Sequence, residues 1–253
     1  IDFRQSGKKV IAFLEYGGDR EYYLATAADR VFLLPTSPLD LVGVASYEVF
    51  LRGAFDTVGA YPDFIHIGEY KTAVNQLTEK GFTPAHREMS ESLNHDRYDQ
   101  LVRGIAMARK KTESEVRRLI DQGPFSPDDA LRAGLVDDLA YLDQLDDRVP
   151  EMRPASGDSS RVEGADYQRI SPRSVGIRPR SKIAVLYAVG VIASGKSSFD
   201  PVNGGVVGSD TLVEQIRQVR ADDSVKAIVL RIDSPGGSSV ASDVIWRELM
   251  ITR

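Results

Sequence analysis

A single stretch near the C-terminal end constrains the fold most, because it joins a strand to a helix through paired glycines. Residues Val225–Ile232 form an apolar run that only Lys226 and Arg231 interrupt. A short run rich in valine and isoleucine is typical of a strand buried on both faces of a sheet. Beyond it, apolar residues recur at helical spacing, at Val240, Val244, Ile245 and Leu249. The stretch predicts a strand, a tight turn and a helix.

The turn itself, Ser234-Pro235-Gly236-Gly237-Ser238, has the composition of an anion site. Adjacent glycines let the backbone adopt left-handed angles and direct its N–H groups outward. Ser238 and Ser239 can cap the following helix, whose positive end then lies beside those N–H groups. Such a turn suits an anion, or an oxygen that becomes anionic in a transition state. A well-capped turn with no chemistry explains the same pattern, so geometry leaves both interpretations open.

Composition limits the function classes. The chain has 253 residues, of which 42% are hydrophobic and 27% charged, as in an ordinary soluble globular protein. Its net charge of -5 argues against a broad nucleic-acid-binding surface. Without cysteine, disulfides, thiolate nucleophiles and cysteine metal sites are excluded. No apolar run approaches the roughly 20 residues that span a bilayer. The chain starts at Ile1 and stops at Arg253 inside the predicted helix, so we expect part of a longer protein.

Strands and helices alternate along the chain, which predicts an α/β fold with a largely parallel sheet. Strands are expected at 9–14, 31–34, 41–45, 62–67 and 183–193, and helices at 21–28, 47–58, 84–110, 113–120, 127–133 and 209–220. Residues 147–180 are rich in Pro, Ser, Gly and Arg and read as a linker or exposed loop. The domain prediction is therefore 1–146, a linker at 147–180, and 181–253.

A second glycine-rich stretch imitates a nucleotide site. Gly190 to Ser197 fits the phosphate-loop pattern of glycine, four residues and Gly-Lys-Ser. A phosphate loop runs directly into a helix, yet Pro201 and Gly204-Gly205 follow here and disfavour one. Val191 and Ile192 also suit a strand better than a loop. We therefore expect no nucleotide, and no other cofactor.

Few residues could act as a catalytic base. The three histidines, His66, His86 and His95, lack metal-ligand spacing and are interpreted as structural or solvated, so no metal is expected. Lys71 follows a predicted strand end. A lysine accepts a proton from serine only when neutral, so its usual pKa of about 10.4 must fall by several units through burial. Spacing alone makes Lys71 one loop lysine among others.

Two motifs together resemble the signal peptide peptidase A (protease IV) family, in its long form with two tandem homologous halves. Gly68-Glu69-Tyr70-Lys71-Thr72-Ala73-Val74 resembles the family's lysine motif, which has serine where Thr72 stands. Ser234-Pro235-Gly236-Gly237-Ser238 resembles its oxyanion-turn motif. The segment 81–88 resembles the stretch that follows the lysine, and the similarity covers almost the whole chain except 147–180.

The resemblance implies a fold and an activity. It implies a Clp-protease/crotonase-like superhelix of β-β-α units, with this chain holding the later part of repeat 1 and the early part of repeat 2. It implies a membrane-associated serine endopeptidase that degrades cleaved signal peptides with a Ser–Lys dyad. Lys71 then corresponds to the general base, and Gly236 and Gly237 to the oxyanion and substrate-binding turn, with Gly237 favoured as donor. Peptide substrates, a homo-oligomer, a membrane segment outside this chain, and the periplasmic face of a bacterial inner membrane are implied as well.

The chain departs from the family pattern at the nucleophile. The family's serine lies in an Ala-Ser-Gly-Gly stretch downstream of the glycine-turn helix, and these 253 residues contain no such stretch. We therefore expect the nucleophile beyond Arg253 and this chain alone to be inactive. Two alternatives remain: an acyl-CoA enzyme of the crotonase type, which shares the glycine turn, and a non-catalytic scaffold homologue.

Overall fold

The computed structural model describes residues 6–150, 162–171, 174, 176, 181–201 and 204–253. These residues form two compact units that divide near residue 160. Each unit is described by itself. The predicted linker at 147–180 lies partly outside the described residues, and its described part includes a short exposed helix, α9 (Gly164–Arg169).

Short parallel strands and their covering helices build the first unit. β1 (Ile11–Leu14), β3 (Arg30–Leu33) and β5 (Asp138–Leu139) form one parallel sheet in the order β1-β3-β5. β2 (Gly17–Gly18) pairs in parallel with β4 (Leu39–Asp40), and α2 (Asp19–Ala25) follows β2 directly. The mixed α/β character expected from the alternating pattern is confirmed.

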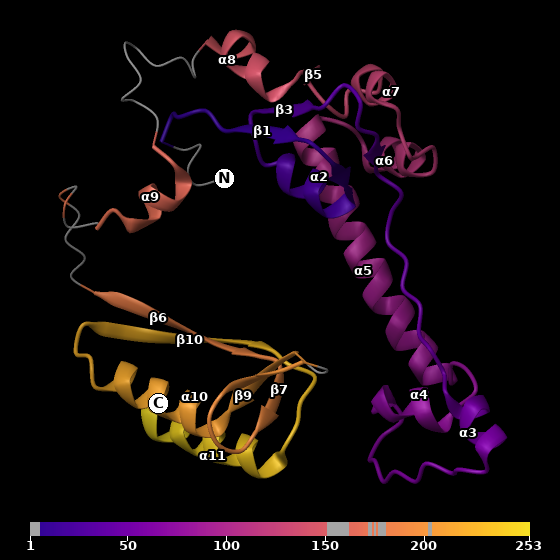
Figure 1. The fold of residues 1–253 in the computed structure, drawn as a ribbon, viewed down its shortest axis with the longest axis vertical. Helices are drawn as coiled ribbons and strands as arrows, with labels where there is room; N and C mark the ends of the chain where they lie inside the picture. The colour runs from indigo at the N-terminus through magenta and orange to yellow at the C-terminus, as the bar shows by residue number, and fades with distance from the viewer. Residues whose placement is uncertain (1–5, 151–161, 172–173, 175, 177–180, 202–203) are drawn as a thin grey trace. The chain divides into compact units, whose positions relative to one another are not determined.

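One long helix, α5 (Pro84–Arg109), runs from the region of α3 (Arg52–Val58) and α4 (Asn75–Thr78) to the sheet region of this unit (Figure 1). The Thr83 hydroxyl accepts a hydrogen bond from the His86 N–H at 3.3 Å, and Pro84 occupies the first turn. Proline there needs no N–H partner, so the local sequence specifies where the helix starts. Three shorter helices follow: α6 (Glu113–Ile120), α7 (Pro127–Arg132) and α8 (Leu145–Arg148).

The core of the first unit lies where α2, α5 and α6 meet the strands. Its largest fully buried side chains include Tyr22, Leu33, Leu39, Leu41, Ile105 and Leu135. The Tyr22 hydroxyl donates to the Leu135 carbonyl at 2.6 Å, and burial raises the pKa of Tyr22 to about 12. The buried hydroxyl is thereby satisfied inside an otherwise apolar cluster.

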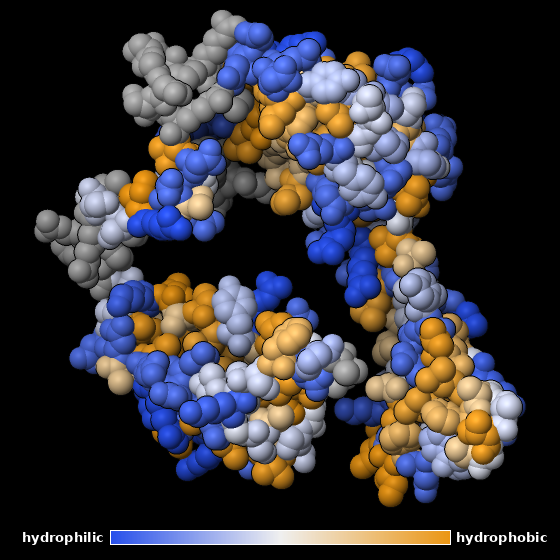
Figure 2. Space-filling view, in the orientation of Figure 1, coloured by the Kyte–Doolittle hydropathy of each residue, from blue (hydrophilic) through white to orange (hydrophobic). Residues whose placement is uncertain are grey.

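Three sequence predictions fail between residues 41 and 67. No strand spans 41–45, the predicted helix 47–58 shrinks to α3 (Arg52–Val58), and the predicted strand 62–67 is absent. Ile65 is 99% exposed and Ile67 90% exposed, and hydrophobic residues gather on the surface of this region (Figure 2). An alternating apolar pattern forms a strand only when a neighbour completes its hydrogen bonds, and none pairs with 62–67 here.

The second unit holds the predicted strand, turn and helix. β6 (Lys182–Val189) pairs in parallel with β10 (Val225–Asp233), while β7 (Val191–Ala193), β9 (Gly204–Gly208) and β8 (Ser198–Asp200) form a second sheet. α10 (Ser209–Arg220) and α11 (Ser239–Thr252) lie together on one side of the β6–β10 pair (Figure 1). The buried carboxylate of Glu248 on α11 joins the helices through Arg217 at 2.8 Å and Arg220 at 2.5 Å.

The expectation that β10 is buried on both faces is wrong. Ile228 and Leu230 pack against the cluster formed with α10 and α11, whereas Val229 on the opposite face is 49% exposed. On β6, Tyr187 is 61% exposed on that same face. Helices cover only one face of the pair, and β10 pairs only with β6 among the described strands. The apolar run thus predicted the strand correctly, but the prediction that both of its faces are buried was wrong.

Candidate functional site

The glycine turn connects β10 directly to α11. The Ser238 hydroxyl accepts a hydrogen bond from the Ala241 N–H at 3.2 Å and so caps the helix. The predicted capping role of Ser238 is thereby confirmed. A capped 14-residue helix then directs its positive end toward the turn.

β7 holds the turn in place through main-chain atoms. The Ile192 N–H donates to the Gly236 carbonyl, and the Ser238 N–H donates to the Ile192 carbonyl, both at 2.8 Å. A Cβ added at Gly237 would lie 2.0 Å from the Ile192 carbonyl oxygen, and Gly237 has a φ of +151°. Only glycine fits this close approach of two backbones.

The two glycines differ in what their N–H groups do. The Gly236 N–H donates to the Ser234 hydroxyl at 3.1 Å. The Gly237 N–H has no acceptor among the described residues, and Gly237 is solvent-exposed. An unpaired N–H beside a helix N-terminus is the kind of donor that stabilises an oxyanion. The geometry thus favours Gly237 over Gly236 as a donor.

Lys71 lies in the first unit, just before the short 3-10 helix η1 (Thr72–Val74). Its N–H donates to the Gly68 carbonyl at 3.3 Å, and its side chain is exposed. An open hollow of about 550 Å³ is lined by Ile67–Lys71, where Tyr70 is 52% exposed. The apolar surroundings that a neutral lysine requires are therefore not formed within the first unit itself.

The segment that follows Lys71 is nevertheless anchored. η1 leads into α4 (Asn75–Thr78), where the Asn75 amide donates to the Thr83 hydroxyl at 3.4 Å. The Gln76 amide donates to Glu48 at 3.4 Å, and Glu48 lies 2.9 Å from Nε2 of His86. His86 is only 2% exposed and packs edge-on against Phe50 and Phe82. These contacts fix the backbone on the C-terminal side of Lys71 and make His86 structural, as expected.

The predicted site residues thus fall into two groups. Gly236 and Gly237 are adjacent in the second unit, and Lys71 belongs to the first unit. Sequence reasoning missed two groups at the turn: the Ile192 main chain, which precedes Gly237 by 45 positions, and the Ser234 hydroxyl. A hydroxyl two residues before a glycine N–H is a known turn pattern, so Ser234 could have been found. No sequence pattern indicates the contact between Ile192 and the turn.

The structure rejects the phosphate-loop interpretation of residues 190–197. Strand β8 begins at Ser198, directly after Lys196 and Ser197, and pairs antiparallel with β9. No helix starts there, so the N–H groups that would cradle phosphate are not presented. Gly190 to Ala193 instead serves the sheet that supports the glycine turn.

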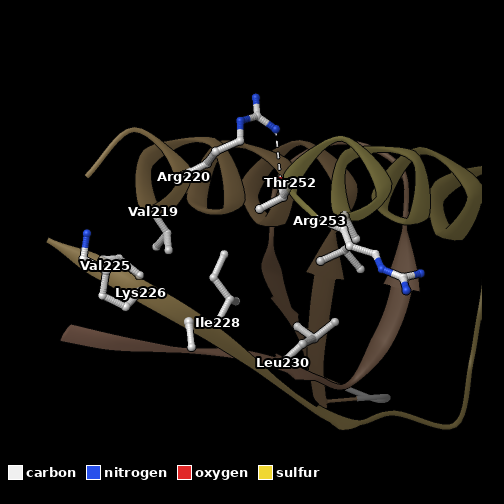
Figure 3. Close-up of a pocket in the computed structure, with 10 residues that line it drawn as sticks. Val219, Arg220, Val225, Lys226, Ile228, Leu230, Thr252 and Arg253 are labelled. Carbon is white, nitrogen blue, oxygen red and sulfur yellow. Dashed lines mark hydrogen bonds between the residues drawn. The ribbon is translucent and has the colours of Figure 1, made fainter. Parts of the chain in front are cut away.

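A hollow in the second unit lies away from the turn. A cavity of about 380 Å³ is lined by Val225, Ile228 and Leu230 on β10 and by the ends of both helices (Figure 3). Thr252 and Arg253 reach it from the C-terminal end of α11, whereas the turn adjoins Ser239 at its beginning. At 1.5 Å per residue, α11 separates the two by about 20 Å. This cavity therefore is not the oxyanion site.

Two kinds of feature are absent from the described residues. No cluster of three or more His, Asp or Glu side chains there has a metal-binding arrangement. None of the helices in that part of the chain combines the length and apolarity that crossing a membrane demands.

Several known proteins are similar to this chain over nearly its whole length. The profile of the family described as Peptidase family S49 matches residues 2–154. The chloroplastic serine protease SPPA of Arabidopsis thaliana is 31% identical over 99% of this chain and 37% of its own length. Protease 4 of Salmonella typhi is 30% identical over 100% of the chain, and Protease 4 of Haemophilus influenzae 27% identical over 97%; each is covered to 41%. The chain thus spans about two-fifths of the length of these curated relatives.

Proposed function

Because the chain belongs to peptidase family S49, we propose that it supplies the general base and the oxyanion donor of a serine endopeptidase. The observation that carries the proposal is the Gly237 N–H, which is held in place on both sides and has no acceptor of its own among the described residues. The related proteins named as serine protease and Protease 4 support a peptidase over other users of a glycine turn.

The proposed reaction uses a Ser–Lys dyad with Lys71 as general base. A neutral Lys71 amine takes the proton from a serine hydroxyl as that oxygen attacks the substrate carbonyl. Negative charge develops on the carbonyl oxygen, where the Gly237 N–H and the α11 N-terminus stabilise it. Lys71 then returns the proton to the leaving amine. The nucleophilic serine is proposed to lie outside these 253 residues, because the family's Ala-Ser-Gly-Gly stretch does not occur in them.

We extend the proposal to the fold, the substrates, the assembly and the location of the full-length protein. We propose that the units follow the Clp-protease/crotonase superhelix, with parts of two repeats in this chain. Substrates are proposed to be cleaved signal peptides, met by a homo-oligomer at the periplasmic face of a bacterial inner membrane. The plant relative is named a chloroplastic serine protease.

Substitution of Lys71 tests the proposal in the full-length gene product. Lys71→Met keeps the side-chain length and removes the base, so kcat for peptide cleavage should fall about 10²–10⁴-fold. Lys80→Met is the matched control, because Lys80 is exposed and, among the described residues, pairs with Asp56 alone, at 2.7 Å. Peptide cleavage should survive the control substitution. Unchanged cleavage by Lys71→Met would remove Lys71 from the mechanism.

A further inference from the structure

The peptide group between Gly236 and Gly237 carries the proposed donor, and its carbonyl end is held by two groups. The Ile192 N–H donates to the Gly236 carbonyl at 2.8 Å, and the Ser234 hydroxyl approaches the same oxygen at 3.4 Å. In a trans peptide the C=O and the next N–H point in opposite directions. Holding the Gly236 carbonyl therefore directs the Gly237 N–H away from β7.

Without such restraints this peptide could rotate. Gly236 and Gly237 have φ values of +109° and +151°, and a Cβ at Gly236 would meet nothing within 4 Å. Glycine on both sides makes a rotated peptide sterically accessible. Rotation would turn the Gly237 N–H toward the Ile192 N–H, and would turn a carbonyl toward the anion position. Hydrogen bonds, rather than side-chain bulk, therefore determine the orientation of the peptide group between Gly236 and Gly237.

Ser234 acts at both ends of residue 236. Its hydroxyl oxygen accepts from the Gly236 N–H at 3.1 Å, and its hydroxyl also contacts the Gly236 carbonyl. The first contact occupies the only other glycine N–H in the turn, and the second adds to the restraint from Ile192. Ser234 is half-buried, so these bonds are partly shielded from water.

We propose that Ser234 is a positioning residue whose hydroxyl keeps the 236–237 peptide in the donor orientation. The proposal rests on the proposed peptidase function. Ser234 touches neither the substrate nor the reacting atoms in this role, and it acts through Gly236. The Ser234 side chain is not the nucleophile.

The test compares Ser234→Ala, Ser234→Thr and Ser239→Ala in the full-length gene product. Loss of one net hydrogen bond should lower kcat by about 3- to 10-fold with KM within twofold. Binding of a peptidyl boronate, which forms a tetrahedral adduct, should weaken by the same factor, whereas binding of an uncleavable substrate peptide should not change. Ser234→Thr retains the hydroxyl and should restore most of the kcat. Ser239→Ala makes the same chemical change at an exposed position whose hydroxyl has no hydrogen-bond partner among the described residues, and it should match the unaltered protein.

Each outcome separates this proposal from the proposed function. Wild-type kcat and boronate affinity in Ser234→Ala, with Lys71→Met inactive, overturn the positioning role alone. No cleavage by the unaltered protein overturns the peptidase assignment and this proposal with it, whereas unchanged cleavage by Lys71→Met removes Lys71 as the base and leaves the Ser234 criteria in force. A boronate adduct mapped by mass spectrometry to Ser234 would make it the nucleophile and also overturn the proposal. If Ser234→Ala does not fold, Ser234→Cys, which keeps the size with a weak hydrogen-bonding group, takes its place under the same criteria.

Discussion

The glycine turn and the lysine segment differ in how far their key groups are bonded and covered. Around the turn, the Gly236 N–H, the Gly236 carbonyl and the Ser238 N–H all have partners, whereas the Gly237 N–H has no acceptor among the described residues. Around Lys71, the backbone is anchored but the side chain is exposed in an open hollow. The proposed donor is thus oriented within its own unit, whereas the proposed base is exposed within the other.

The contrast follows from what each group needs. An oxyanion donor needs orientation, which a few local hydrogen bonds and a crowded glycine provide. A lysine base needs to lose its positive charge at neutral pH, which requires apolar cover over the whole amine. Exposed Ile67 and Tyr70 beside Lys71 are suitable material for such cover. The proposed chemistry therefore depends on this surface being covered in the active protein.

Substituting a glycine in each region gives the largest expected difference. Gly237→Ala would bring its Cβ to 2.0 Å from Ile192, so we expect about 3 kcal/mol of destabilisation from strain and the broken bridge. If the turn is the oxyanion site, kcat should also fall about 10²–10³-fold. Gly68→Ala has a φ of +87° but open space, and should cost about 1 kcal/mol.

The destabilisations by Gly237→Ala and Gly68→Ala can be measured separately, because each unit has its own reporter. Trp246, the single tryptophan, lies on α11 and reports urea unfolding of the second unit by fluorescence. Hydrogen exchange of α4 and α5 amides reports the first unit. Equal destabilisation by the two substitutions would contradict the view that only the turn is sterically closed.

Local signals explain which features the sequence predicts. The Thr83-Pro84 start of α5, the span of α10 and the strand–turn–helix around Gly237 depend on neighbouring residues, and all were predicted. The absent strand at 62–67 and the exposed face of β10 depend on partners distant in sequence, which periodicity does not encode. The site shows the same division, because Gly237 is recognisable by motif and its contact with Ile192 is not.

The next largest effect tests how firmly the lysine segment is anchored. His86→Ala removes a buried ring that packs against Phe50 and Phe82 and pairs with Glu48, so we expect about 2–3 kcal/mol of destabilisation in the first unit. His95→Ala on the same helix is the matched control, because His95 is exposed. Hydrogen exchange at η1 and α4 should accelerate only in His86→Ala. No difference between the two variants would show that the Glu48–His86 contact anchors nothing.

The smallest effect concerns a well-satisfied acid in the second unit. A hydrogen bond from Ser224, followed by one from Lys182, lowers the pKa of Asp222 to about 2 from its usual 3.8. Because the folded pKa is the lower one, the stabilising contribution is present above about pH 3.8 and is lost as pH falls through about 2. Carboxyl ¹³C shifts should show the Asp222 midpoint near 2.

A variant checks the cause of that shift. Ser224→Ala removes the largest contribution, so the Asp222 midpoint should move upward toward its ordinary value. An unaltered protein in which Asp222 titrates at its ordinary value would contradict the described bonds between the starts of β6 and β10.

Ile192 holds the turn through one main-chain N–H and one main-chain carbonyl, while its side chain packs against the apolar cluster of the second unit. Any amino acid other than proline can furnish both, so exchange of this side chain leaves the anion-binding geometry unaltered in principle. A library randomised at this codon would vary the apolar packing next to the turn while preserving the donor. Proline, which has no N–H to donate to the Gly236 carbonyl, should be the variant most strongly depleted by a selection for turnover.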